Sequence, residues 1–226
     1  MAIQNVVNSA QKGAVLLELL ISSLLSVGVI GSLTLLLVSS LKVGTNRAHK
    51  LVLVESVSSV VQQIKQDVQR AGYGSGRGVR ATLAGVVDTV YIDKHLLAYR
   101  YWVKEEQAYR HVVFKWQQTE GRQRIHNEQS INSGKRINNG QLLICEKMSQ
   151  SALTLEQAKR SGRMGNCFNL FDPNHVGVSE FELAVTPHTE SSVSRQLVLM
   201  SISSYLVSNP KIKYHVNTLV FIRNSE

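Results

Sequence analysis

Glu18 is a lone carboxylate in a long apolar run, and its position poses the first chemical question of this sequence. Between Lys12 and Lys42 it is the only charged residue. An ionised side chain inside a membrane helix costs on the order of 3 kcal/mol, so it needs a cation, hydrogen-bond donors or a proton. Cutting the chain between Gly13 and Ala14 would create a cation, the new α-amino group. Within one rigid helix that ammonium does not easily reach Glu18, but it can reach the glutamate of an offset neighbour, which favours stacking of many similar helices.

The run that carries this carboxylate, residues 14–41, is long enough to cross a bilayer, which takes about 20 apolar residues. It exceeds the apolar core of a cleavable secretory signal, usually about 7–15 residues. We therefore expect a retained, membrane-spanning segment, and a single-pass protein with one exposed domain.

The helical pattern continues beyond the apolar run. Val54, Val57, Val61, Ile64 and Val68 recur at three- and four-residue steps, which places them on one stripe. The sequence predicts one helix over residues 14–71, apolar all round at first and amphipathic over 42–71. The glycine-rich AGYGSGRG (71–78) is expected to end it. That stretch is a poor phosphate cradle, because it follows a helix and lacks a Gly-Lys-Ser/Thr element.

The hydrophobic period changes to two in the remaining residues, 72–226. A hairpin is predicted over 97–103 and 111–116, with Glu105–Gln107 as its turn. Further strands are predicted at 86–92, 180–185, 196–203 and 214–223. The predicted fold class is α+β: a long N-terminal membrane-spanning helix whose amphipathic second half packs on a mainly antiparallel β-sheet.

Cys145 and Cys167 are the two cysteines of the chain, and they lack CxxC or zinc-site spacing. In a domain outside the cytoplasm such a pair most simply forms a disulfide, worth about 3 kcal/mol in the chain-entropy model. The alternative is two unrelated buried thiols.

The stretch KG-AVLLELLI resembles the prepilin signature shared by type IV pilins and type II secretion pseudopilins. Lys12, Gly13, Ala14 and Glu18 match that signature at the right spacing. Further similarity is to the minor pilins of the PilW family, which typically carry an Asp, Arg, Ala, Gly and Tyr element where the helix leaves for the sheet. That element is matched by Asp67, Arg70, Ala71, Gly72 and Tyr73, and the closing strand TLVFIRN (218–224) also fits.

The resemblance implies a pilin-like fold and a series of processing and assembly steps. A prepilin peptidase would remove the leader 1–13 by cutting after Gly13, and would methylate Ala14. The mature subunit would stay in the bacterial inner membrane, with residues 72–226 periplasmic, and would then join an extracellular pilus by contacts of its N-terminal helix with other major and minor pilins. Ala14 departs from the phenylalanine of most members. No cofactor is implied.

Charge counting gives the opposite orientation. Lys42, Arg47 and Lys50 flank the far end of the span, against Lys12 on the near end. Positive charge usually marks the cytoplasmic side, which would leave the large domain in the cytoplasm. The leader motif and the cysteine pair favour the periplasm instead.

The net charge of +9 suits anionic partners such as lipid headgroups or nucleic acid. Arg122, Arg124, Lys135 and Arg136 make the segment 117–140 a possible DNA patch. Glu120 and Glu128 in the same segment fit an ordinary solvated loop equally well, and this reading is preferred. A pilus-borne DNA-binding subunit and a secretion pseudopilin thus stay as alternative functions.

Catalytic and metal-site motifs are missing from the sequence, which contains neither HExxH nor GxSxG. The seven histidines are scattered along the chain. We therefore expect a structural subunit and no enzyme, with a membrane-anchored enzyme of unrecognised site as the remote alternative.

Overall fold

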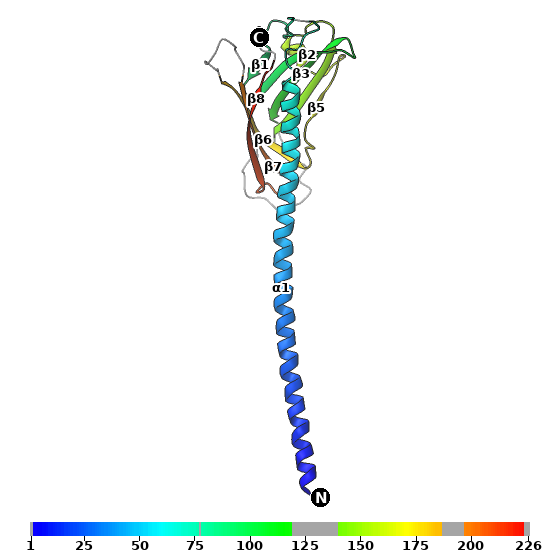
Figure 1. Ribbon diagram of the computed structural model, residues 1–226, viewed down its shortest axis with the longest axis vertical. Helices are drawn as coiled ribbons and strands as arrows, with labels where there is room; N and C mark the ends of the chain where they lie inside the picture. Colours follow the sequence, from blue (N-terminus) through cyan, green and yellow to red (C-terminus); the bar gives the residue numbers. More distant parts are fainter. Residues whose placement is uncertain (1, 77, 119–139, 187–196, 224–226) are drawn as a thin grey trace, which may run out of the picture. The chain divides into compact units, whose positions relative to one another are not determined.

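The computed structural model describes residues 2–76, 78–118, 140–186 and 197–223, with side chains from residue 15 onward (Figure 1). The chain divides into two compact units, Met1–His49 and Lys50–Glu226. A single long helix, α1 (Ala2–Val68), supplies the first unit and the start of the second.

Helix α1 begins and ends earlier than the sequence predicted. It begins at Ala2 instead of residue 14, because the leader contains no proline or other strong helix breaker. It ends at Val68 instead of Ala71, where a turn takes over with an Arg70 N–H to Asp67 carbonyl bond of 3.0 Å. Gly72 follows with φ of 81°, a left-handed conformation that glycine adopts without strain.

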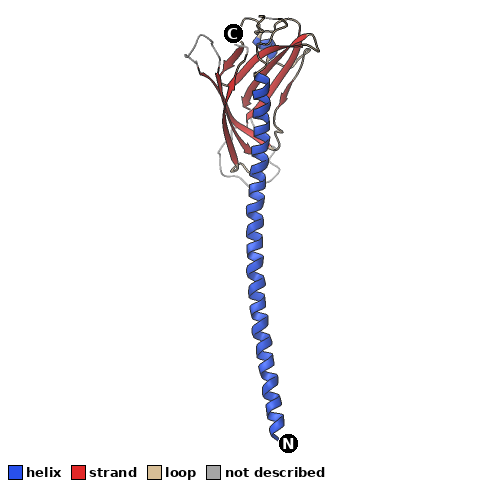
Figure 2. Ribbon diagram, viewed as in Figure 1, coloured by secondary structure: helices blue, strands red, loops and turns tan. Residues whose placement is uncertain are grey.

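The second unit contains an eight-stranded, entirely antiparallel sheet (Figure 2). Seven strands follow the order β1-β2-β3-β4-β6-β7-β8, and β5 pairs with β4 off this path. The α+β class with a long apolar N-terminal helix is therefore confirmed. The strands are β1 (Val90–Asp93), β2 (Leu96–Val103), β3 (Ala108–Gln118), β4 (Gly140–Ser149), β5 (Cys167–Asn169), β6 (Val176–Thr186), β7 (Leu197–Leu206) and β8 (Lys213–Phe221).

The predicted hairpin is confirmed as β2 and β3, whose register runs from Leu96 opposite Lys115 to Val103 opposite Ala108. Its turn contains Gln107 with φ of 47°. Strand β1 is shorter than predicted, because residues 86 and 87 are irregular and 88 and 89 form bends before pairing begins at Val90. Strands β6, β7 and β8 lie where period-two alternation placed them.

Strands β4 and β5 are not predicted by the sequence pattern. Alternation fails in β4 because both of its faces are covered: Leu142 faces the main core and Cys145 a second, smaller cluster, each fully buried. Strand β4 meets β6 through a single pair, Gly140 and Val178. Glycine is required there, since a Cβ atom would lie 2.1 Å from the Trp116 indole nitrogen.

The main core lies between α1 and one face of the sheet. The C-terminal part of α1, cyan in Figure 1, runs alongside the strands. Four of the five residues of its predicted stripe are buried, with Val57, Ile64 and Val68 at most 1% exposed, whereas Val54 is half-buried. The buried residues share one cluster with sheet residues such as Tyr99 and Phe114. Burying each such side chain contributes about 1.5–3 kcal/mol, so packing, more than helix propensity, holds this part of α1.

The opposite face of the sheet carries a smaller cluster under the short helix α2 (Leu155–Ala158). Thr154 caps α2 by accepting a hydrogen bond from the Gln157 N–H, and the Gln157 side chain accepts one from the Thr154 N–H in return. Ala158 is thereby set against Cys145 and Val113.

Candidate functional site

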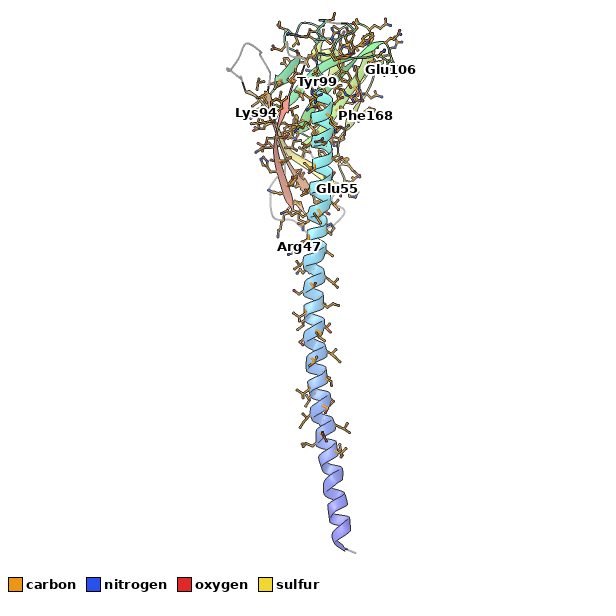
Figure 3. The ribbon with its side chains drawn as sticks, in the orientation of Figure 1. Arg47, Glu55, Lys94, Tyr99, Glu106 and Phe168 are labelled. Carbon is orange, nitrogen blue, oxygen red and sulfur yellow. A yellow bond between two sulfur atoms is a disulfide. The ribbon has the colours of Figure 1, made fainter. Side chains whose placement is uncertain are left out.

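The first unit is a helix whose apolar side chains are exposed on all sides. Large apolar residues from Val15 to Val43 are about half exposed or more, with Leu35 at 74% (Figure 3). Within the described part of the chain, α1 from residue 15 is the one helix long and apolar enough to cross a membrane, with a mean hydropathy reaching 2.2. Such a surface is stable in lipid or against other apolar helices.

Several hydroxyl groups in this segment donate hydrogen bonds to the helix backbone. Ser22 donates to the Glu18 carbonyl at 2.8 Å, Ser26 to the Ser22 carbonyl at 2.8 Å, and Thr34 to the Ile30 carbonyl at 2.8 Å. These bonds remove the cost of placing hydroxyls in an apolar medium.

The Glu18 side chain differs from those hydroxyls. Over the described side chains, from residue 15 onward, no cation or hydrogen-bond donor lies within bonding distance of its carboxylate. It is exposed on α1, four residues after Ala14, which with Gly13 belongs to the same continuous helix. In lipid such a carboxylate needs a cation, a hydrogen-bond donor or a proton.

The four basic residues of the possible DNA patch, Arg122, Arg124, Lys135 and Arg136, lie outside the described residues. The two cysteines lie within them. Cys145 on β4 and Cys167 on β5 are opposite each other in the strand register and are joined by a disulfide with an S–S distance of 1.98 Å. The bond ties the short strand β5 to the sheet.

A second polar site lies where α1 meets β2, and sequence reasoning missed its contacts. The Asp67 carboxylate accepts hydrogen bonds from the Tyr99 hydroxyl at 2.6 Å and from the Tyr101 hydroxyl at 2.8 Å. Both tyrosines are at most 3% exposed. The sequence does contain a signal for this site. Alternation along β2 predicts that both tyrosine rings are buried, and a buried phenol hydroxyl needs a hydrogen-bond acceptor.

Burial and the Asp67 charge keep both phenols protonated. Burial first, and then the Asp67 charge, raises the pKa of Tyr101 to about 12, and the same two causes raise the pKa of Tyr99 well above its ordinary value. Arg110 on β3 and Glu146 on β4 form an ion pair beside this site. The end of α1 is thus held on the sheet by polar contacts as well as by packing.

The Asp67–Tyr73 segment also makes backbone contacts with β2. The Gly72 N–H donates to the Arg100 carbonyl at 3.0 Å, and the Tyr73 carbonyl accepts from the Trp102 N–H at 2.8 Å. These bonds continue along the edge of β2 beyond the end of β1, so the residues that leave the helix serve as a sheet edge.

One row of polar side chains bears on catalysis. Ser203 on β7 donates to the Glu180 carboxylate at 3.2 Å and lies 2.8 Å from His215 Nδ1, so the serine stands between the acid and the histidine. In a hydrolase triad the histidine stands between the serine and the acid. In the described ranges no group of three or more His, Cys, Asp or Glu side chains could hold a metal ion.

Comparison with known proteins adds a family assignment. No curated protein and no solved structure matches the chain. A family model described as prepilin peptidase-dependent protein B matches residues 46–222, which is 177 of the 226 residues. The match begins after the apolar span, so it is independent of the leader motif at residues 11–21. The chain belongs to the prepilin peptidase-dependent protein B family, a pilin-related family.

Proposed function

We propose that the protein is a minor type IV pilin, similar to the PilW family, that primes or joins pilus assembly. Its leader, 1–13, is removed by the prepilin peptidase between Gly13 and Ala14, and Ala14 becomes the N-methylated first residue. Residues 14–41 then anchor the subunit in the inner membrane, 42–71 continue the helix, and 72–226 form a periplasmic, pilin-like domain. The family match supports dependence on the peptidase.

The observation that carries this proposal is the Glu18 carboxylate, which has no partner among the described side chains and lies on an apolar helix that is exposed on all sides. Leaving it ionised in lipid is costly, whereas pairing it with the new α-amino group of an adjacent pilin neutralises both charges. Removal of the leader therefore creates the partner that draws helices together.

A pseudopilin of a type II secretion system is the alternative that would use the same pairing of Glu18 with an α-amino group. The subunits with which the protein assembles distinguish the two.

An enzymatic role has less support. In the Glu180–Ser203–His215 row the serine hydroxyl donates to the Glu180 carboxylate. This carboxylate therefore contacts the serine and does not orient the histidine, as the acid of a hydrolase triad does. We propose that the domain is a structural module without a cofactor.

The N-terminal mass of the protein isolated from membranes tests the proposal. We expect a chain beginning at Ala14 and carrying one methyl group, and we expect Gly13→Leu to leave the full-length chain uncut. An intact Met1 with two free thiols would contradict both the processing and the periplasmic location. Cross-linking through residue 18 followed by identification of the partners separates pilus subunits from secretion subunits.

A further inference from the structure

A groove of about 450 Å³ lies at the end of α1, at the end of the sheet where the β2–β3 turn is found. Gln69, Arg70 and Tyr73 line it from the helix end, and the stretch from Tyr101 to Glu105 lines it from β2 and the turn. Arg223, just after β8, completes it. Figure 3 labels Tyr99 and Glu106, which lie on β2 and in that turn.

The groove is cationic. Arg70, Lys104 and Arg223 line it, against the single carboxylate of Glu105 in the lining. In the described portion of the chain none of these three cations is within ion-pair distance of a carboxylate. Arg70 also lies over the Tyr101 ring, 6.0 Å from its centroid, where it still borders the groove.

Aromatic faces lie among these cations. Tyr73 is 57% exposed, and Trp102 is half-buried. The Trp102 indole makes an edge-to-face contact with the Tyr109 ring, with 4.9 Å between the ring centroids, and this contact orients the indole. The Trp102 backbone N–H donates to the Tyr73 carbonyl. The backbone bond places the two residues side by side, and both line the groove.

We propose that this groove binds single-stranded nucleic acid, with Trp102 and Tyr73 stacking on bases and with Arg70, Lys104 and Arg223 contacting phosphates. Cations along a groove combined with stacking aromatics are the features that sequence-tolerant single-strand binders use. The volume lies in the range of small-ligand sites, which fits a nucleotide unit better than a duplex. The inference goes beyond the assembly role, since it uses neither the leader nor Glu18.

The two tryptophans of the chain give a direct readout. In full-length protein purified in detergent, titration with an oligothymidylate of about 12 nucleotides is expected to quench the fluorescence of Trp102. The quench is expected to persist in Trp116→Phe and to vanish in Trp102→Phe. Quenching that survives in Trp102→Phe would overturn the proposal.

A matched pair of variants tests the cations. Lys104→Gln with Arg223→Gln removes two groove charges, and Lys211→Gln with Lys213→Gln removes two exposed charges elsewhere. The groove pair is expected to weaken binding about tenfold and to lower the slope of log K against log salt by about 1.4. The control pair is expected to change affinity less than about twofold.

Three results would refute the proposal that the groove binds single-stranded nucleic acid. The first is an equal loss of affinity in both pairs, which shows unspecific attraction to a basic protein. The second is binding of heparin without quenching by oligothymidylate, which shows a site for polyanionic polysaccharide instead. The third is loss of binding on replacing Arg122, Arg124, Lys135 and Arg136 while the groove variants bind normally.

Discussion

The carboxylate of Asp67 and the hydroxyl of Tyr99 form a hydrogen bond of 2.6 Å, although 32 positions separate them in the sequence. Asp67 lies in the last turn of α1 and Tyr99 in β2, and the bond is within the polar site that also includes Tyr101. Apolar packing alone tolerates small sliding of a helix on a sheet. Two directed bonds to one carboxylate set both the rotation and the translation of the helix end.

Replacing Asp67 by alanine is expected to destabilise the domain by about 2–4 kcal/mol, because it leaves two buried phenol hydroxyls without their acceptor. Urea unfolding of the full chain in detergent, followed by near-ultraviolet circular dichroism, measures the loss. Asp67→Ala combined with Tyr99→Phe and Tyr101→Phe is expected to regain part of it, since no unsatisfied hydroxyl then remains.

Glu55→Ala is the matched control for Asp67, since Glu55 is an exposed carboxylate on the same helix (Figure 3). It is expected to change the free energy of unfolding by less than about 0.5 kcal/mol. Equal effects of the two substitutions would show that the Asp67–tyrosine bonds contribute nothing beyond surface charge.

His111 makes the domain sensitive to acid. It is fully buried on β3, and its Nε2 accepts a hydrogen bond from the Leu153 N–H at 3.1 Å. Burial lowers its pKa from 6.5 to about 4. Between these two values the unfolded chain binds a proton that the folded protein does not, so the free energy of unfolding falls as the pH is lowered from 6.5 to 4, by at most about 3 kcal/mol.

Urea unfolding at several pH values measures this dependence. His111→Gln, which keeps an acceptor and cannot be protonated, is expected to flatten it in that window. His215→Gln, at an exposed position on β8, is expected to leave the slope unchanged. A wild-type curve that is flat from pH 6.5 to 4 would contradict the argument.

The disulfide between Cys145 and Cys167, with a sequence separation of 22, is expected to stabilise the oxidised domain by about 3 kcal/mol. Dithiothreitol should lower the urea midpoint of the wild type by the corresponding amount. The double variant Cys145→Ala with Cys167→Ala should unfold at the reduced midpoint whether or not the reductant is present. A reductant effect of equal size in the double variant would locate the sensitivity elsewhere.

Much of the fold follows from periodicity, and its failures have definite causes. The helix stripe packs on the core, and the β2–β3 hairpin places its large side chains, such as Tyr99 and Phe114, on the core face, so periodicity identified both. The hairpin is also covered on its other face, where the smaller Ala98 and Val113 are buried. Strand β4 is buried on both faces, at Leu142 and at Cys145, and so shows no alternation. The end of a helix is set by the conformation of one turn, which a pattern repeated over many residues does not predict. Helix α1 accordingly ends at Val68 and not at Ala71.

Of the two candidate sites, one could be identified from the sequence and the other could not. Glu18 was evident from the sequence because one charge in an apolar run is conspicuous without any contact. The Asp67 site was not, because its meaning depends on which strand lies beside the last turn of α1. That neighbour is set by the sheet order, which local patterns do not encode.

Glu18→Leu is expected to block assembly while leaving the earlier steps intact. The variant should still insert in the membrane, since leucine is more favourable there, and should still begin at Ala14 after processing. Without the carboxylate, the α-amino group of its neighbour stays unpaired in lipid, and recruitment into filaments should fall at least about tenfold, the equivalent of 1.4 kcal/mol. Immunoblots of sheared filaments, normalised to the membrane fraction, measure this ratio. Ser26→Ala in the same segment loses only a bond to the Ser22 carbonyl and should assemble normally. Normal filament incorporation of Glu18→Leu would refute the charge-pairing mechanism, even if the peptidase still cuts after Gly13.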